Sequence, residues 1–249
     1  MLVLDNVYQL SGYDFGTVSS MFAVRGKDSL AIVEAGGKHD LEVAAKTMEC
    51  WGLTRYPVTH VFITHSHFDH IENALHFRKM GAKIVAVAGD ADAVEAGDDR
   101  VIDYGPFCKE VSRDKRFSCP VDIRAKDGDI IRAADHEFQV IHLPGHTDGS
   151  HFLKLTVGGK IVYFTGDIER AYYRDGFRGA RLAWSGGSDY NRKVFFESLK
   201  KMANLPADVL LPSHGQKTMV DGWKILQGMY LRALLDWRGP SVQDEYKWD

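Results

Sequence analysis

Residues 58–70 decide the fold, and they read Val-Thr-His-Val-Phe-Ile-Thr-His-Ser-His-Phe-Asp-His. The first part of this stretch is a short β-branched, apolar run of the kind found in buried strands. The second part places three imidazoles and one carboxylate within six residues, as His65, His67, Asp69 and His70. A lone histidine is usually a surface or core residue. Four ligand-type side chains at the end of one strand indicate a metal site instead.

The spacing of these four residues suggests two metal ions. If the strand ends near Thr64, His65 and His67 project the same way, because side chains alternate along an extended chain. Asp69 and His70 then begin a helical turn and can point at a neighbouring centre. Imidazole nitrogen combined with carboxylate oxygen suits zinc, iron or manganese better than calcium or magnesium.

Three later segments repeat the pattern of an apolar strand-like run that ends in a ligand-type residue. They are Val140-Ile-His-Leu-Pro-Gly-His146, Ile161-Val-Tyr-Phe-Thr-Gly-Asp167 and Val209-Leu-Leu-Pro-Ser-His214. Each of these residues alone would be an ordinary loop or turn residue. Together with the first cluster they supply seven candidate ligands, carried on loops at the ends of rigid strands.

These motifs resemble those of the metallo-β-lactamase fold superfamily. Its HxHxDH motif stands here at His65–His70, and its later motifs match Gly145-His-Thr, Thr165-Gly-Asp and Ser213-His-Gly in order, so that the resemblance covers roughly residues 15–216. The resemblance implies an α/β fold, a four-layer αββα sandwich. We expect one domain over residues 1–249, with a C-terminal helix at 219–236.

The resemblance also implies a ligand scheme and an activity. The family pattern assigns His65, His67 and His146 to one divalent ion, Asp69, His70 and His214 to a second, and Asp167 to a bridge between them. Zinc is the expected metal, with iron or manganese as alternatives. Two such ions present a bridging hydroxide as nucleophile. Asp69 is the expected catalytic residue, because it can orient this hydroxide and pass a proton to the leaving group.

Hydrophobic periodicity gives an outline of the elements around these motifs. It predicts helices over residues 39–51, 72–79, 189–203 and 219–236. It predicts strands over residues 2–10, 18–24, 30–33, 58–64, 83–88, 121–124, 129–133, 137–142, 151–157, 160–165 and 209–211. Strand clusters in both halves, interleaved with helices, favour two packed sheets with helices outside.

Residues 169–190 are expected to form a long irregular loop with interleaved aromatic and arginine side chains. Loops of this length inside a compact domain are usually functional. The side chains expected to contact substrate, from this loop, from the first hairpin turn and from the HxHxDH motif, are Arg170, Tyr172, Tyr173, Trp184, Tyr13, Phe15 and Phe68. His142 and His151 flank the His146 loop and are candidates to fix the tautomer of a ligand.

Composition limits the classes of partner. The net charge is −3 without a lysine or arginine block, which argues against nucleic acid or an anionic membrane as partner. No basic leader or long apolar run is present, and three cysteines lack disulfide or zinc spacing, so a reducing cytoplasm is the expected compartment. We expect a small-molecule substrate. Residues 229–235 are apolar enough for either the core or a homodimer contact.

The expected reaction is the opening of a carboxylic ester, thioester, lactone or lactam. Only 35 residues follow His214, fewer than the helical glutathione-binding extension of hydroxyacylglutathione hydrolases requires. Arg170 stands where lactonase relatives often place a tyrosine. Residues 145–150 resemble subclass B3 β-lactamases, but Asp167 and the lack of an export signal argue against an antibiotic-resistance enzyme. The alternatives are an iron-dependent oxygenase of the persulfide dioxygenase type and a phosphodiesterase on the same fold.

Overall fold

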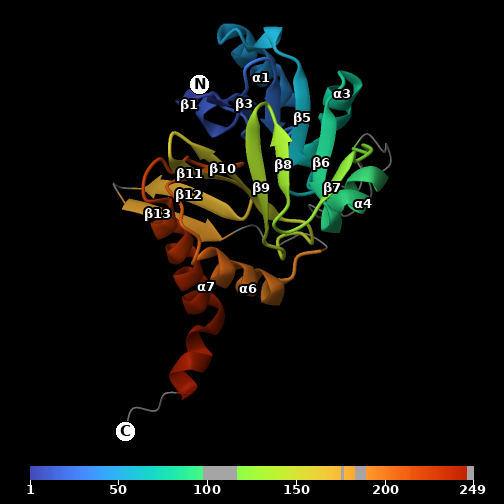
Figure 1. The fold of residues 1–249 in the computed structure, drawn as a ribbon. Helices are drawn as coiled ribbons and strands as arrows, with labels where there is room; N and C mark the ends of the chain where they lie inside the picture. The colour runs from blue at the N-terminus through green and yellow to red at the C-terminus, as the bar shows by residue number, and fades with distance from the viewer. Residues whose placement is uncertain (98–116, 175–176, 183–188, 246–249) are drawn as a thin grey trace.

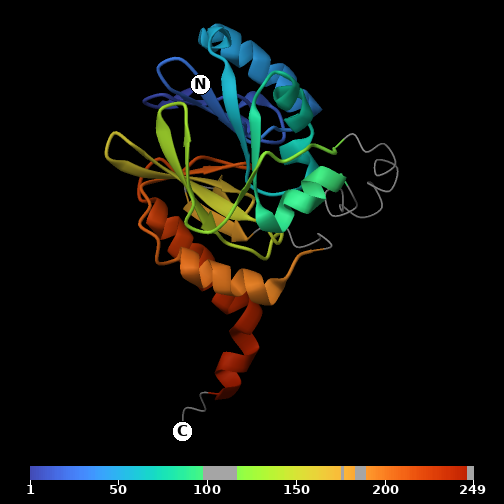
Figure 2. The same ribbon diagram turned by 45° about the vertical axis from the view of Figure 1, so that its right-hand side comes forward.

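Two β-sheets lie face to face, with helices on both outer faces, so the αββα sandwich predicted from the sequence is confirmed (Figures 1 and 2). The computed structural model describes residues 1–97, 117–174, 177–182 and 189–245, with side chains at all of these except 170–181 and 238–245. The strand order is β1-β2-β3-β4-β5-β6-β7 in the larger sheet and β14-β11-β10-β9-β8 in the smaller.

The elements fall into these two sheets, one separate hairpin and the flanking helices. The larger sheet comprises β1 (Leu2–Leu4), β2 (Val7–Gln9), β3 (Phe22–Arg25), β4 (Leu30–Val33), β5 (Val58–Ile63), β6 (Lys83–Val87) and β7 (Ile123–Ala125). The smaller sheet comprises β8 (Ile130–Ala133), β9 (His136–His142), β10 (His151–Val157), β11 (Lys160–Gly166) and β14 (Val209–Pro212). The helices are η1 (Tyr13–Phe15), α1 (Lys38–Cys50), η2 (Leu53–Arg55), α2 (Phe68–Ile71), α3 (Ala74–Lys79), α4 (Ala88–Ala96), α6 (Arg192–Met202) and α7 (Gly222–Glu245).

The core between the sheets is built from large apolar side chains that alternate inward along each strand. Phe62 of β5 meets Phe138 of β9 with ring centroids 4.6 Å apart, and Phe22 of β3 meets Phe164 of β11 at 5.4 Å. All four rings are buried. Burial of such rings is the main stabilising contribution to a sheet-on-sheet interface. These contacts fix the two sheets relative to each other.

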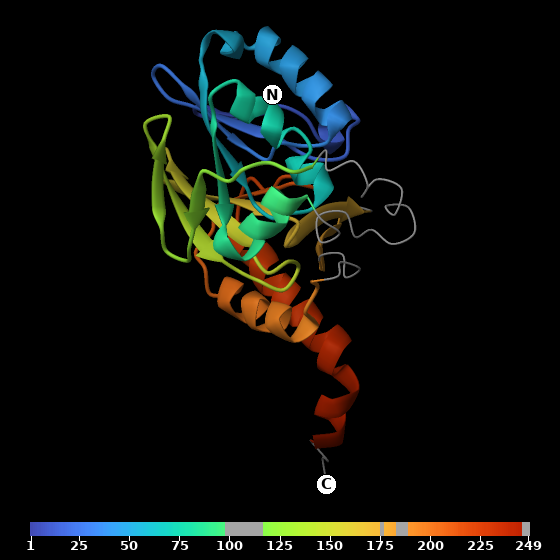
Figure 3. The same cartoon turned by 90° about the vertical axis from the view of Figure 1, so that its right-hand side faces the viewer.

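The outer faces of the sheets are covered by helices with one apolar stripe. α1 packs Ala44 on the larger sheet, and Asp40 accepts a hydrogen bond from the Gly37 N–H at 2.9 Å, which caps the helix start. α6 packs Phe195 and Leu199 on the smaller sheet, and its N-cap Asn191 accepts from Val194 N at 3.2 Å. α7 packs beside α6, and its C-terminal end extends away from the body (Figure 3).

The strands position the candidate site because several of them end at the same edge. β4, β5 and β6 pair in parallel, and β11 and β14 also pair in parallel. Parallel strands bring their carboxyl ends to one edge of a sheet. Asp167 and His214, which come within two residues of the ends of β11 and β14, therefore emerge close together. His65 stands in the corresponding place after β5 of the larger sheet.

The prediction of an irregular loop over residues 169–190 is wrong in part. Residues Glu169–Arg174 form β12 and residues Phe177–Leu182 form β13, and the two strands pair antiparallel. The sequence signal was an Asp-Gly pair at 175–176 between two runs rich in Tyr, Phe and Arg, which is a strong hairpin signal. The strands lack the apolar–polar alternation that usually marks a strand, which is why periodicity missed them.

Other boundaries differ from the sequence prediction for local reasons. The helix predicted over 72–79 begins only at Ala74, as α3, and the separate α2 ends before it at Ile71. Between them the Asn73 side chain turns inward and donates to the carbonyls of Ala35, Gly36 and Gly37 at 2.9 Å. α4 was not predicted as a helix. The C-terminal helix begins at Gly222 and ends at Glu245, rather than at 219 and 236.

Two further predictions concerned the N-terminal strands and residues 229–235. The strand predicted over 18–24 begins only at Phe22, and the segment 2–10 is divided by Asn6, whose φ is 63°. In α7, Met229 is buried in the core whereas Leu231 and Leu235 are exposed, so this stretch contributes to the core only in part.

Within the described ranges, no helix combines the length and the apolar character needed to cross a bilayer.

Candidate metal centre

The HxHxDH loop follows β5 and enters α2 within a few residues, which turns its side chains inward. His65, His67 and His70 are all at most 1% exposed, and Asp69 is 5% exposed. Ionisable side chains are rarely buried so completely without a binding or catalytic role.

His65, His67 and His146 form a first group. Their ring nitrogens lie within 4.8 Å of one another, and their ring centroids are 4.7–4.8 Å apart. Burial lowers the pKa of His67 to about 3 and, helped by neighbouring imidazoles, lowers the pKa of His65 well below its usual value. His65 and His67 are therefore neutral near pH 7, and the neutral imidazole is the form that coordinates a metal.

Asp69, His70 and His214 form a second group. Asp69 Oδ1 lies 3.4 Å from His70 Nε2, and Asp69 Oδ2 lies 3.1 Å from His214 Nε2. The Nδ1–H of His214 donates to the carbonyl of Val18 at 2.9 Å. This bond fixes the tautomer of His214 and leaves Nε2 directed at the two carboxylates.

Asp167 lies between the two groups and faces both. Its Oδ2 is 3.7 Å from His146 Nε2 in the first group. Its Oδ1 is 3.4 Å from His70 Nε2 and 3.2 Å from His214 Nε2 in the second. Gly166 before it has φ +54°, and a Cβ at that position would collide with the Thr64 hydroxyl. Glycine thus permits the turn that aims Asp167 into the cluster.

Glu34 is a buried carboxylate of this site that the sequence analysis missed. It accepts hydrogen bonds from the Thr64 hydroxyl and from the Ser213 hydroxyl, the latter at 2.8 Å, and lies 3.3 Å from His70 Nδ1. Burial opposes the charged form of His70, but Asp69, Glu34 and Asp167 outweigh it and raise the pKa of His70 to about 10. Its sequence signal was present, because Glu34 directly follows the apolar strand 30–33.

Asp90 is a second missed carboxylate, and it supports the first group. Its Oδ2 accepts from Ser66 N at 2.8 Å and from Thr147 Oγ1 at 2.7 Å, and its Oδ1 accepts from Gly149 N at 2.6 Å. Ser66 lies between His65 and His67, and Thr147 follows His146, so Asp90 ties together both loops that carry the first group. Burial outweighs these hydrogen bonds and raises the pKa of Asp90 to about 6. Asp90 lies in the unpredicted helix α4, and no sequence pattern marked it.

The donor set fits divalent metal ions of the imidazole-and-carboxylate class. The buried His65 Nε2 makes no hydrogen bond within the described part of the chain, which leaves its lone pair available to a metal. The carboxylates of Asp69 and Asp167 face imidazole nitrogens at distances that a bound cation can bridge. The seven ligand candidates from the sequence all meet here, in two groups that share one carboxylate.

The expected substrate contacts are only partly described by the structure. Tyr13 lies in η1 and is 67% exposed, whereas Phe15 is half-buried. Phe68 is half-buried and packs against the outer core, with its ring 6.0 Å from that of Phe117. The side chains of Arg170, Tyr172 and Tyr173 and all of Trp184 lie outside the described residues.

Side chains next to the ligand motifs form hydrogen bonds with the backbone of the loop after His146 and of the start of α1. His151 Nδ1 donates to the Gly149 carbonyl at 3.0 Å, and His142 Nε2 donates to the Asp148 carbonyl at 2.8 Å. Both histidines thus bind the backbone of the loop that follows His146. Glu72 accepts from Lys38 N at 3.0 Å and caps the start of α1.

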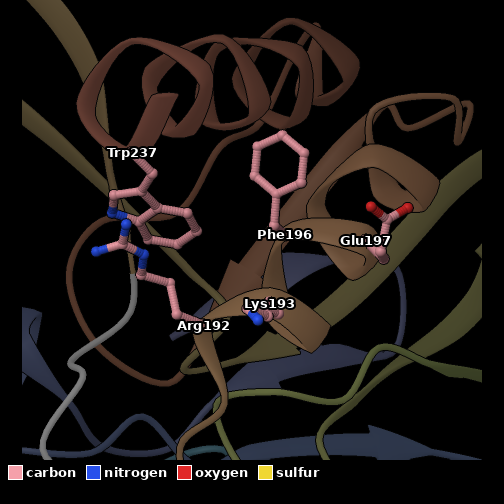
Figure 4. Close-up of a pocket in the computed structure, with 5 residues that line it drawn as sticks. All are labelled: Arg192, Lys193, Phe196, Glu197 and Trp237. Carbon is pink, nitrogen blue, oxygen red and sulfur yellow. The ribbon is translucent and has the colours of Figure 1, made fainter. Parts of the chain in front are cut away.

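A surface cavity of about 420 Å³ between α6 and α7 lies apart from these ligands. Its lining residues are Arg192, Lys193, Phe196, Glu197 and Trp237 (Figure 4). The Arg192 guanidinium lies over the Trp237 ring at 5.6 Å, a cation–π contact that links the start of α6 to α7. None of the seven ligand candidates is among the residues that line this cavity.

Comparison with known proteins agrees with this geometry. The sequence profile of the Metallo-beta-lactamase superfamily matches residues 14–214. Hydroxyacylglutathione hydrolase of Cereibacter sphaeroides is 24% identical, over 73% of this chain and 58% of its own length. An acyl-coenzyme A thioesterase of Gallus gallus is 28% identical, over 61% of this chain and 60% of its own length. The chain thus spans about three fifths of each of these curated relatives.

Solved structures share the whole fold at low sequence identity. The subclass B3 metallo-beta-lactamase of Bradyrhizobium japonicum superposes with a TM-score of 0.71, at 17% identity, and covers 98% of this chain and 94% of its own. At this identity the likeness shows the fold alone. The profile match, in contrast, covers more than half of the chain and includes all seven ligand candidates.

Proposed function

The chain belongs to the metallo-beta-lactamase superfamily, and from this membership we propose that it is a hydrolase that uses two divalent metal ions to open a small carboxylic ester, thioester, lactone or lactam. The observation that carries the proposal is the position of Asp167 between two groups of buried ligands. In this proposal His65, His67 and His146 hold the first ion, and Asp69, His70 and His214 hold the second.

The chemistry of the bound ions follows from general principles. Bound by these residues, divalent ions would supply Lewis-acid chemistry: they would lower the pKa of a nearby water and polarise the carbonyl of the substrate. Zinc is the proposed metal, since three or more imidazoles with carboxylates are its usual protein ligands. Iron and manganese accept the same donors.

The chain's own residues hold and orient the ligands and move the proton. Asp69 Oδ2 accepts the Ser19 hydroxyl at 3.0 Å, and Asp69 Oδ1 makes no hydrogen bond within the described residues. We assign to Oδ1 the proton transfer from the attacking water to the leaving group. His70 is held through Nδ1 by Glu34 and His214 through Nδ1 by Val18, so both direct Nε2 into the site.

Among the candidate substrates, a thioester is the one to test first. The names of two relatives specify thioester chemistry, hydroxyacylglutathione hydrolase and acyl-coenzyme A thioesterase. The near-neutral charge of the chain, −3 over 249 residues, supports a small-molecule substrate over a polyanion.

The free cysteines Cys50 and Cys119 fit the cytoplasmic location that we propose for the protein.

The test is a turnover panel on the metal-loaded protein. We expect hydrolysis of a carboxylic thioester or lactone, loss of this activity on chelation and its return with zinc. Turnover of phosphodiesters alone would contradict the carbonyl assignment. Oxygen consumption with a persulfide, together with iron as the bound metal, would place the protein with oxygenases instead.

A further inference from the structure

A short backbone segment before β3 touches two of the proposed ligands of the second ion. We call residues Val18–Ser20 the strap. The Val18 carbonyl accepts from His214 Nδ1 at 2.9 Å, and the Ser19 hydroxyl donates to Asp69 Oδ2 at 3.0 Å. Two consecutive residues therefore contact two ligands that lie far apart in the sequence.

The strap is itself held firmly, so its contacts are pre-ordered. Ser19 N donates to Asp40 Oδ1 at 3.1 Å, and the Ser19 carbonyl accepts from the Ser11 hydroxyl at 2.8 Å. Ser20 N donates to the Ser213 carbonyl at 2.7 Å, directly beside His214. The Ser19 side chain is fully buried. A donor fixed through its own backbone N–H and carbonyl can hold a carboxylate in one orientation.

The two groups of ligands are supported by different parts of the fold. Asp90 ties together the loops that carry His65, His67 and His146. The strap contacts Asp69 and His214, which belong to the second group. Because these supports are separate, loss of one can weaken one ion without an equal effect on the other.

We propose that Ser19 is a positioning residue that holds Asp69 for the second metal ion, and that the strap thereby controls occupancy of this position selectively. The inference rests on the proposed two-metal function. Hydrogen bonds from partners behind a metal ligand typically contribute about 10–100-fold to metal affinity. We therefore expect Ser19→Ala to weaken binding of the second ion by about 10–100-fold, while the first ion binds as in the wild type.

The experiment measures zinc binding itself rather than activity. The full-length wild type and the Ser19→Ala variant are freed of metal and titrated with Zn²⁺ in competition with a chromophoric chelator, which resolves two stepwise dissociation constants. Ser20→Ala is the matched control, because Ser20 is the next residue of the strap and is equally buried. Its hydroxyl contacts Gln9 Nε2 at 3.4 Å rather than a ligand. Ser19→Thr, which keeps the hydroxyl, is the rescue variant.

The outcomes separate the strap from the function on which it rests. Weaker binding of the second ion alone in Ser19→Ala, with Ser20→Ala and Ser19→Thr close to the wild type, supports the proposal. Equal weakening of both ions, equal loss in Ser20→Ala, or unchanged binding in Ser19→Ala overturns it while the two-metal function stands. A wild type that binds only one zinc ion overturns the two-metal function and the selectivity of the strap together.

Discussion

The carboxylate of Asp167 lies with Oδ1 3.2 Å from Nε2 of His214, although the two residues follow different strands of the smaller sheet. Its other oxygen faces His146 at 3.7 Å. A single buried carboxylate therefore faces both groups of ligands, and from this position it could contact both of two adjacent cations.

Replacement of Asp167 tests this bridging role. Asp167→Asn removes the charge and leaves only one oxygen to face both groups, so we expect fewer than two metal ions per chain. Turnover should fall at least about 100-fold, since even residues behind the ligands contribute up to that factor. Elemental analysis and steady-state kinetics measure the two effects. Asp236→Asn, on the exposed face of α7, is the control and should retain both ions. Two ions retained in Asp167→Asn would argue against a bridge.

Asp90 gives a prediction for the first group of ligands. In Asp90→Asn the amide nitrogen cannot accept, so at least one of the donors Ser66 N, Thr147 Oγ1 and Gly149 N loses its partner. We expect the free energy of unfolding to fall by about 1–3 kcal/mol and zinc affinity at the first position to fall by about 10–100-fold. Chemical denaturation and zinc titration measure these effects. Asp129→Asn, which removes an exposed carboxylate that accepts from Lys126 N, should change neither substantially. Unaltered zinc affinity in Asp90→Asn would show that Asp90 does not position the ligands.

Gly145, next to His146, is predicted to tolerate no side chain. Its φ is +122°, and a Cβ there would collide with the backbone of Phe195 at the start of α6. Gly158 also has a positive φ, +55°, but a Cβ at that position would meet nothing within 4 Å. We expect Gly145→Ala to lower the free energy of unfolding by about 1–3 kcal/mol more than Gly158→Ala, because overpacking adds to backbone strain. Thermal unfolding of both variants measures this difference. An equal fall in the free energy of unfolding in Gly145→Ala and Gly158→Ala would show that the contact between Gly145 and α6 is not tight.

His151 makes stability depend on pH. Burial lowers its pKa from 6.5 to about 4, so the folded protein holds the neutral ring where the unfolded chain already binds a proton. The resulting stability is present above about pH 6.5 and is lost as the pH falls through about 4; it amounts to about 3 kcal/mol. We expect His151→Gln to lose this dependence, which urea unfolding at a series of pH values measures. His39→Gln, at an exposed position of α1, should behave as the wild type. An identical pH dependence in His151→Gln would rule out this assignment.

Much of the site was predictable because each ligand candidate follows an apolar strand. His65, His146, Asp167 and His214 stand at such positions, and their side chains converge where the strands end. Glu34 follows the same rule after β4 and could have been found in the same way. The sandwich was also accessible, because short strands interleaved with helices restrict the layers that can form.

Other features could not be derived from local sequence, because they depend on contacts between distant residues. Asp90 acquires its role only when α4 packs beside the loop after His146. Ser19 lies 50 positions before the Asp69 that it contacts, and its chain segment reads as an ordinary continuation of a strand. The hairpin β12–β13 was missed because its residues lack the periodicity that marks a half-buried strand.

The most direct test of the two-metal account is the zinc content of the purified protein, measured together with its thioesterase or lactonase activity before and after chelation. We predict two ions per chain at full activity, loss of turnover when the metal is removed, and recovery as zinc is returned. A chelated protein without metal that still hydrolyses its substrate at the original rate would contradict the account.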